Sequence, residues 1–416
     1  MKKGAKILLL GAMICLMALA IDFFTRSEAA PPIKIGVISE WDFIGGHGTK
    51  RAAELAIRHI NAGGGLLGRE VKGVFYDSKA DPGEAKNATE RVLYSDKVDV
   101  VCGYWRSDLA IVCQPLVMEA KKILLLGGSA APLLTKGRIK EDYNKYKYTF
   151  TAQPNSLLTL HPIDQSIISS MKLGLGKIAL MVEKAAWCDP IFDVFSKKYA
   201  NKIVYSNRFS TAATDFSVEF SQVKALGADI LVVLSTGRGG IASVKQWYDM
   251  KIPAVYVGYP EAAQDPNFWE QTEGKCDGVA VGHIGGLLGL SITPKSVPYY
   301  NEYKKVYGEY PVAYTNASTY DIVMAWAQGV RSAGTIESPA VVKAMEKKPF
   351  NYVGVSGVLE YFNEIHNPVG GGWKEDEAWG WVSFQWQNGK REIYWPETHK
   401  TKDMIIPDRI RKLMTK

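Results

Sequence analysis

Short apolar strands alternate with segments of helical periodicity along the first third of the chain. The predicted strands lie at 33–38, 71–76, 98–102 and 123–126, and the predicted helices between them lie at 50–61, 82–94 and 108–120. A helix between successive strands is typical of a parallel sheet that helices cover on both faces. Asp81 and Pro82 suit the N-cap and first position of the second helix.

The same alternation starts again after Pro154. It predicts helices at 157–172, 189–200, 215–226 and 240–250, and strands at 177–182, 203–206, 229–234 and 254–257. Helices at 297–307 and 315–333 then return the chain to the first set, and a tail follows that is predicted to be β-rich and that is rich in tryptophan. A length of 416 residues also suits two domains rather than one core.

We therefore predict an α/β fold of two doubly wound parallel-sheet lobes. The predicted first lobe comprises 30–152 and 283–355, and the predicted second lobe comprises 153–282 and 356–416.

The first 29 residues have the pattern of a secretory signal peptide. Three lysines precede an apolar stretch at 7–20, and Ser27 and Ala29 are small residues at the spacing that signal peptidase accepts. The apolar stretch is shorter than the ~20 residues of a spanning helix. We expect cleavage before Ala30 and export to the periplasm; the alternative is an uncleaved membrane anchor.

Charge and cysteine spacing remove several function classes. The formal net charge is +7, but basic and acidic residues are mixed along the chain, so no basic run predicts a nucleic-acid partner. Four of the five cysteines follow the leader, and none forms a CxxC pair. A zinc or redox motif is therefore not expected. Buried free thiols and a disulfide both remain open.

Candidate binding residues lie in the loops after the predicted strands, because ligands of open parallel sheets bind beyond the carboxyl ends of the strands. Ser107 and Ser129 each lie at or just before a helix start, where backbone N–H groups, a hydroxyl and the helix dipole suit a carboxylate. Ordinary helix capping is the alternative for both. Aromatic and charged residues in the same set of loops are Trp41, Trp105, Arg106, Trp187, Arg238, Tyr259 and Glu261.

Catalytic motifs are missing from the sequence. The six histidines are scattered, and there is no HExxH, GxSxG or P-loop. The SxxK match at 169–172 falls inside a predicted helix, and the Gly45-Gly46-x-Gly48 segment, predicted to be a ligand-binding loop, lacks the GxGxxG spacing. We expect no enzymatic activity, no cofactor and no metal.

Several stretches in one order resemble a known family. They are IKIGVIS at 33–39, HINAGGGLLGREV at 59–71, YDSKADPGEA at 76–85, CGYWRSDLA at 102–110, ILLLGGSAAPLLT at 123–135 and FQWQNGK at 384–390. From about 33 to 396 the chain resembles the periplasmic binding proteins of branched-chain amino-acid ABC transporters, the Leu/Ile/Val-binding type. The resemblance implies a type I periplasmic binding protein fold, with a three-strand hinge and a ligand in the cleft between the lobes.

By position, the resemblance implies that Ser107 binds the ligand carboxylate and that backbone groups of Ser129 and Ala130 contact its carboxylate and amine. It places Trp187 as an aromatic wall and Glu261 as partner of a ligand ammonium. The chain departs from the family where Ala130 or Ala131 replaces a threonine and where Gly45 replaces an aromatic residue; Arg106 and Arg238 add positive charge.

The expected function is that of a monomeric receptor which captures a small amino acid or related carboxylate and delivers it to an inner-membrane ABC permease. The departures keep an aromatic acid or an amide open as ligand. A sensory module of the same fold and an exported hydrolase are the alternatives in other function classes.

Overall fold

The computed structural model describes residues 30–152, 155–236, 239–283, 290–370 and 382–415. The predicted leader, Arg238 and the tryptophans at 373, 379 and 381 lie outside the described residues. In the part of the chain that is described, no helix is long and apolar enough to cross a membrane.

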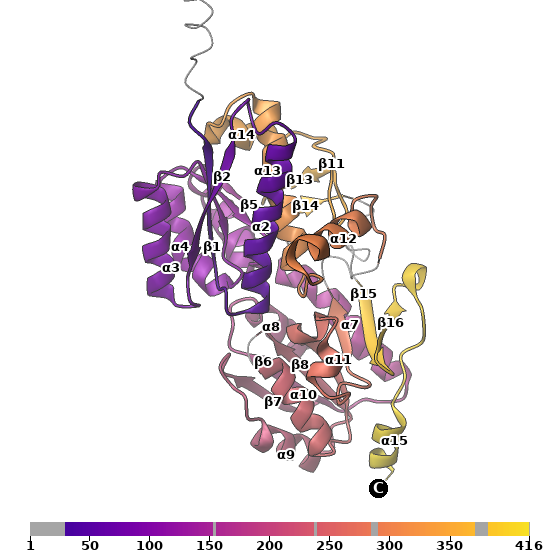
Figure 1. Cartoon of the computed structure of the whole chain (residues 1–416). Coiled ribbons are helices and arrows are strands. Elements are labelled where there is room, and N and C mark those ends of the chain that lie inside the picture. Colours follow the sequence, from indigo (N-terminus) through magenta and orange to yellow (C-terminus); the bar gives the residue numbers. More distant parts are fainter. Residues whose placement is uncertain (1–29, 153–154, 237–238, 284–289, 371–381, 416) are drawn as a thin grey trace, which may run out of the picture.

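The first lobe is built on a parallel sheet of five strands in the order β2-β1-β3-β4-β5. These strands are β1 (Ile33–Ser39), β2 (Val71–Asp77), β3 (Val100–Gly103), β4 (Ile123–Leu126) and β5 (Thr149–Thr151). Helices on its two faces include α2 (Ile44–Ala62), α3 (Pro82–Glu90), α4 (Ser107–Glu119) and α13 (Thr315–Ala333) (Figure 1). As predicted, Asp81 caps α3 by accepting hydrogen bonds from the N–H groups of Gly83 and Glu84, at 2.8 and 2.9 Å.

Later segments complete the first lobe. They are α5 (Lys136–Glu141), α6 (Tyr143–Tyr146), α12 (Ser296–Tyr307), α14 (Ser338–Met345) and the two-residue strands β11 (Tyr352–Val353), β12 (Val358–Leu359), β13 (Tyr361–Phe362) and β14 (Pro368–Val369). The predicted return to the second lobe at residue 356 is wrong. Leu359 and Phe362 are buried in the first core, and the Phe362 ring lies 5.0 Å from that of Phe150.

The second lobe repeats the strand order of the first. Its sheet runs β7-β6-β8-β9-β10 in parallel, and β15 and β16 extend it in antiparallel fashion beyond β10. The strands are β6 (Ile178–Glu183), β7 (Ile203–Phe209), β8 (Ile230–Ser235), β9 (Val255–Pro260), β10 (Ala280–His283), β15 (Val382–Gln387) and β16 (Lys390–Trp395). The helices are α7 (Ser156–Lys172), α8 (Asp189–Lys198), α9 (Ser217–Ala225), α10 (Gly239–Asp249), α11 (Phe268–Gln271) and α15 (Asp408–Met414).

Each lobe has its own hydrophobic core, so the predicted α/β fold of two doubly wound lobes is confirmed. The chain passes from one lobe to the other three times, between β5 and α7, between β10 and α12, and between β14 and β15 (Figure 1). Parallel sheets of this order have a switch point where neighbouring strands lead to opposite faces, and ligands bind outside the carboxyl ends there.

The glycine-rich segment after β1 is helical, which corrects the expectation of a loop. Helix α2 begins at Ile44 and contains Gly45, Gly46 and Gly48 in its first turns. A Cβ at position 46 would lie 2.0 Å from the carbonyl oxygen of Glu40, and one at position 48 would lie 2.6 Å from the side chain of Asn316. Close packing of the helix start, rather than loop flexibility, therefore requires glycine here.

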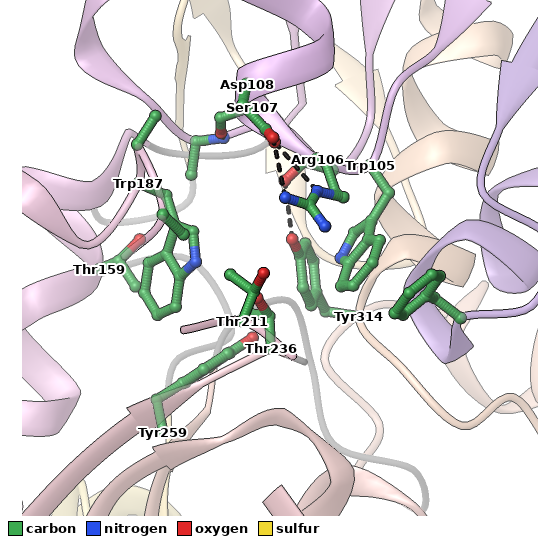
Figure 2. Close-up of a pocket in the computed structure, with 15 residues that line it drawn as sticks. Trp105, Arg106, Ser107, Asp108, Thr159, Trp187, Thr211, Thr236, Tyr259 and Tyr314 are labelled. Carbon is green, nitrogen blue, oxygen red and sulfur yellow. Dashed lines mark hydrogen bonds and ion pairs between the residues drawn. The ribbon is translucent and has the colours of Figure 1, made fainter. Parts of the chain in front are cut away.

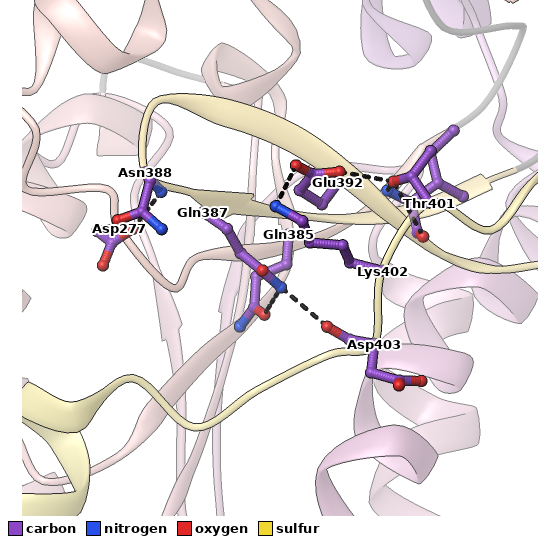
Figure 3. Close-up of polar contacts among 9 residues, drawn as sticks. Asp277, Gln385, Gln387, Asn388, Glu392, Thr401, Lys402 and Asp403 are labelled. Atoms are coloured by element: carbon purple, nitrogen blue, oxygen red, sulfur yellow. Dashed lines mark hydrogen bonds and ion pairs between the residues drawn. The ribbon is translucent and has the colours of Figure 1, made fainter.

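The polypeptide after β16 runs back along the second sheet and is held by side chains of β15 (Figure 3). The Gln385 amide donates to the carbonyl of Ile405 at 2.9 Å and accepts from its N–H at 3.0 Å, and Gln387 donates to the carbonyl of Asp403 at 2.9 Å. Lys402 pairs with Glu392 at 2.7 Å. These bonds fix the C-terminal segment to the second lobe.

Candidate ligand cleft between the lobes

A cavity lies where the carboxyl ends of the two sheets face each other (Figure 2). The first lobe supplies Phe43, Trp105, Arg106, Ser107, Asp108, Gly128, Ala130 and Tyr314, and the second supplies Thr159, Ala185, Ala186, Trp187, Thr211, Thr236 and Tyr259. Residues of both lobes therefore enclose one site at the place where the fold directs ligands.

Five of the fifteen lining residues contribute aromatic rings to its walls. Trp187 and Tyr259 meet edge to face at 5.4 Å on the side of the second lobe, and Phe43 and Trp105 lie 5.6 Å apart on the side of the first. Tyr314 stands between Trp105 and the second lobe (Figure 2), and its hydroxyl donates to the carbonyl of Gly128 at 2.7 Å. Such walls suit a flat or apolar solute body.

Ser107 is the first residue of α4, and its hydroxyl joins two parts of the site. The Oγ atom accepts hydrogen bonds from the N–H groups of Ala130 and Ala131, at 3.0 and 3.1 Å. Both bonds use the oxygen as acceptor, so the hydroxyl proton is left to donate. Ser107 lines the cavity, and that proton suits an acceptor atom of a ligand.

Ser129 and Ala130 occupy the loop after β4, where the Ser129 hydroxyl and both backbone polar groups of Ala130 already have partners. The Ser129 hydroxyl donates to the carbonyl of Tyr104, and the carbonyl of Ala130 accepts from the N–H of Ser156 at 2.8 Å. Ala130 lines the cavity, whereas Ser129 is buried beside it.

Arg106 brings a guanidinium to the cavity, but an acidic neighbour holds it. Its Nε and Nη2 atoms donate to the two carboxylate oxygens of Asp108, at 3.0 and 2.8 Å. A bidentate pair of this kind fixes the guanidinium plane and offsets its charge. The pair leaves less positive charge for a ligand than the sequence suggested.

Glu261 belongs to the short helix η3 (Glu261–Gln264) of the second lobe and is 1% exposed. The indole N–H of Trp105, from the first lobe, donates to its Oε1 atom at 3.2 Å, and its Oε2 atom has no hydrogen-bond partner among the described residues. Burial and the charge of nearby Glu183 raise the pKa of Glu261 well above its ordinary value, against the opposing effect of the Trp105 N–H.

Two further buried carboxyl groups lie close by, and the sequence analysis missed both. Glu40 directly follows β1, and its pKa is raised to about 7, chiefly by burial, although its Oε1 atom accepts from the N–H of Arg106 at 3.4 Å. Glu183 ends β6 and accepts from the Trp187 indole at 3.3 Å and from the Thr236 hydroxyl. A glutamate at the carboxyl end of an otherwise apolar parallel strand is the signal that could have found them.

Other residues differ from the sequence prediction: some predicted residues lie outside the cavity lining, and some lining residues were not predicted. Trp41 lies outside the cavity lining, and the Lys50 ammonium stands 4.2 Å from its ring. Arg238 is outside the described residues, so its place in the site stays a prediction. Phe43, Thr159, Thr211 and Tyr314 line the cavity without having been predicted, because each comes from a segment with no distinctive motif.

Metal and thiol chemistry find no support in the described part of the chain. No group of three or more histidine, cysteine or acidic side chains there could hold a metal ion. Cys102, Cys113, Cys188 and Cys276 are free and buried, which decides the alternative that the sequence left open. Burial raises the pKa of each thiol, to about 12 for Cys102 and Cys276. They act as small apolar core residues.

Known proteins share this architecture. The chain is 22% identical over 430 residues to Leu/Ile/Val-binding protein homolog 7 of Brucella melitensis biotype 1, covering 94% of this chain and 99% of the relative. The branched-chain amino acid transporter substrate binding protein of Streptococcus pneumoniae, solved with isoleucine, superposes with a TM-score of 0.74 at 23% identity, covering 88% of this chain and all of the other. A solute binding protein of an R. palustris ABC transporter, solved with 4-hydroxybenzoate, gives 0.73 at 18% identity, covering 91% and 98%.

Two doubly wound lobes around an enclosed cleft define a two-lobed binding protein of type I. Residues 32–373 match the family described as periplasmic binding protein, and the chain belongs to that family. The resemblance inferred from the sequence is thereby confirmed.

Proposed function

We propose that the chain is the solute receptor of an ABC importer, which captures a small carboxylate or amino acid in the cleft between its lobes. The cavity that both lobes line carries this proposal, because a family member of this fold offers a space between its lobes that is lined by aromatic rings and a few directed polar groups. The relatives support the transport role. Neighbours solved with isoleucine and with 4-hydroxybenzoate span the ligand range that we consider.

Within the cleft, Ser107 is the proposed donor to the ligand carboxylate, beside the backbone of Ser129 and Ala130. Trp187 and Tyr259 would hold the body of the ligand. The remaining proposed contacts are Trp105, Arg106 and Arg238; the contact predicted for Glu261 is not part of this proposal, because Glu261 is absent from the cavity lining. No step of this function needs a cofactor, and we propose that the protein catalyses no reaction.

The proposed mechanism is closure of the lobes over the solute. Closure excludes water and strengthens each hydrogen bond that the few polar groups make. We propose that the chain is exported with its leader removed before Ala30, acts as a monomer in the periplasm, and delivers the solute to an inner-membrane permease.

A thermal-shift screen of the mature chain tests the solute-binding function. The panel contains amino acids, aromatic acids, short carboxylates and amides. A solute that binds only the folded protein raises the melting temperature by mass action, so at least one class should give a concentration-dependent rise. The Ser107→Ala variant should lose that rise. Consumption of the solute would favour a hydrolase, and a panel without any shift would contradict the proposal.

A further inference from the structure

Trp105 connects the two lobes at the cavity wall. It comes from the loop after β3 in the first lobe, lines the cavity, and packs into the hydrophobic core of the second lobe. Its indole N–H donates to Oε1 of Glu261, which lies 156 residues further along the chain. Trp105 thus stands where a bound solute, the first lobe and the acidic residue of the second lobe meet.

The position of this indole is fixed by its surroundings. A Cβ at position 45 would lie 2.2 Å from the Trp105 Nε1 atom, so the ring fills the space that the missing side chain of Gly45 leaves. The Phe43 ring packs against it at 5.6 Å, and a Cβ at position 128 would lie 2.9 Å from the Trp105 Cα atom. Two glycines and one ring therefore hold the indole in its present orientation.

This arrangement separates Glu261 from the solute. Trp105 lines the cavity, whereas Glu261 is not among the lining residues and is 1% exposed. An ammonium group on a solute would need a carboxylate oxygen within hydrogen-bond distance to offset its loss of hydration. In this cleft the indole N–H already donates to one oxygen of Glu261, and the glutamate side chain is buried outside the cavity lining.

The charged residues of the described lining do not offer an ammonium group a free carboxylate in place of Glu261. They are Arg106 and Asp108, and the carboxylate of Asp108 is engaged by both donating nitrogens of the guanidinium. The hydroxyl of Ser107, in contrast, retains a proton for an acceptor atom. The lining thus favours a solute that accepts hydrogen bonds at one end and carries no cation.

We propose that Trp105 sets the solute class of this cleft: its indole replaces the ammonium of a solute as the donor to Glu261, so the protein selects carboxylates or amides without an amino group over amino acids. This inference rests on the proposed function and narrows its ligand. It assigns the specificity to one residue and explains why Gly45 accompanies it.

Matched solute pairs test this assignment by calorimetric titration of the full mature chain. The pairs are 4-methylpentanoate with leucine and 3-phenylpropanoate with phenylalanine, in which the members differ only by the α-amino group. Wild type should bind the acid at least about tenfold more tightly than the amino acid in one or both pairs. The Trp105→Phe variant keeps a ring but lacks the N–H, so Glu261 becomes available and the preference should fall at least about tenfold.

Two further variants separate this effect from a general disturbance of the cleft. Trp247→Phe removes an indole N–H that donates to the carbonyl of Ala254 in the core of the second lobe, outside the cavity lining, and should leave the preference unchanged. Adding Glu261→Gln to Trp105→Phe should abolish the gain for the amino acid, because the carboxamide bears no charge. Melting curves of each variant, measured without solute, establish that it is folded.

The outcomes distinguish the two proposals. The role of Trp105 would be overturned if the wild type preferred the amino acid, or if the Trp105→Phe variant kept the wild-type preference. Either result would leave the solute-binding function intact. If neither member of either pair binds, the wider screen decides: binding of amino acids alone would show the assigned class to be wrong, and binding of acids or amides alone would support it. A screen without any binding solute would remove the receptor function itself.

Discussion

Glu40 places an ionisable group where water does not reach it. It follows β1 directly, is fully buried, and its carboxylate accepts two long hydrogen bonds, from the N–H of Arg106 and from the Ser39 hydroxyl, both at 3.4 Å. Burial raises its pKa from 4.5 to about 7, so the folded chain binds this proton more tightly than the unfolded chain does. The stability contributed by the protonated group is complete below pH 4.5 and is lost as the pH rises to about 7.

The Glu40→Gln variant should remove this dependence. A pKa rise of that size corresponds to about 3 kcal/mol of unfolding free energy above pH 7. The amide stays neutral and can still accept from Arg106, so the variant should gain stability relative to wild type between pH 5 and pH 8. Denaturant unfolding at both pH values measures the difference. Glu90→Gln, at an exposed position, should follow wild type; parallel profiles for Glu40→Gln and wild type would contradict the prediction.

Helix α2 shows at the scale of an element how a neighbouring side chain determines the local sequence. Its first turns contain Gly45, Gly46 and Gly48, although glycine in a helix costs roughly 0.5–1 kcal/mol relative to alanine. The contact between Gly45 and the Trp105 indole accounts for the first of these, because the ring occupies the place of a side chain. The start of helix α2 and the part of the cleft wall that Trp105 forms therefore pack as one unit.

Substitution of Gly45 by alanine should destabilise the protein despite the gain in helix propensity. The new Cβ would lie 2.2 Å from Trp105 Nε1, and overpacking of this kind costs about 1–3 kcal/mol. In a Trp105→Ala background the same change should cost less, and a double-mutant cycle from denaturant unfolding measures the coupling. Gly63→Ala, whose Cβ meets only carbonyl oxygens at 3.5 Å, is the control. Additive effects of the two substitutions would contradict the close contact.

The helices and strands of both lobes could be predicted because each carries its own apolar period. Helix α13 has the predicted bounds of 315 and 333, and most of the other predicted elements agree to within a few residues. The small strands β11 to β14 were missed, since two-residue strands have no period to detect. Tertiary packing also overrode composition at the glycine-rich start of α2.

The candidate site was only partly predictable for a different reason. The rule that ligands bind beyond parallel strands located the correct loops, so Ser107, Trp105 and Trp187 were found. The partners of these side chains lie far away in sequence. Trp105 and Glu261 are 156 residues apart and belong to different lobes, and neither residue carries a local signal of the other.

At the scale of the whole molecule, the lobes meet through helix η3. Its first residue, Glu261, accepts from Trp105, and its last, Gln264, accepts from the N–H of Tyr314 at 3.3 Å. Both donors belong to the first lobe and both acceptors to the second. These bonds join the two lobes in the structure, and we expect contacts of a solute with both lobes to add to them.

Removal of the Gln264 acceptor should weaken solute binding without altering a lining residue. Loss of one such hydrogen bond costs about 0.5–1.5 kcal/mol, so Gln264→Ala should raise the Kd about two- to tenfold. The increase should come mainly from faster dissociation, because the closed state becomes less populated. Stopped-flow kinetics with the solute from the screen measures this rate, and small-angle scattering should show a larger radius of gyration for the unliganded variant.

Gln246→Ala removes an acceptor for the N–H of Phe216 inside the second lobe and should lower stability while leaving the Kd unchanged. An unchanged dissociation rate and radius in Gln264→Ala would mean that η3 does not hold the lobes together, and that closure depends on the solute alone.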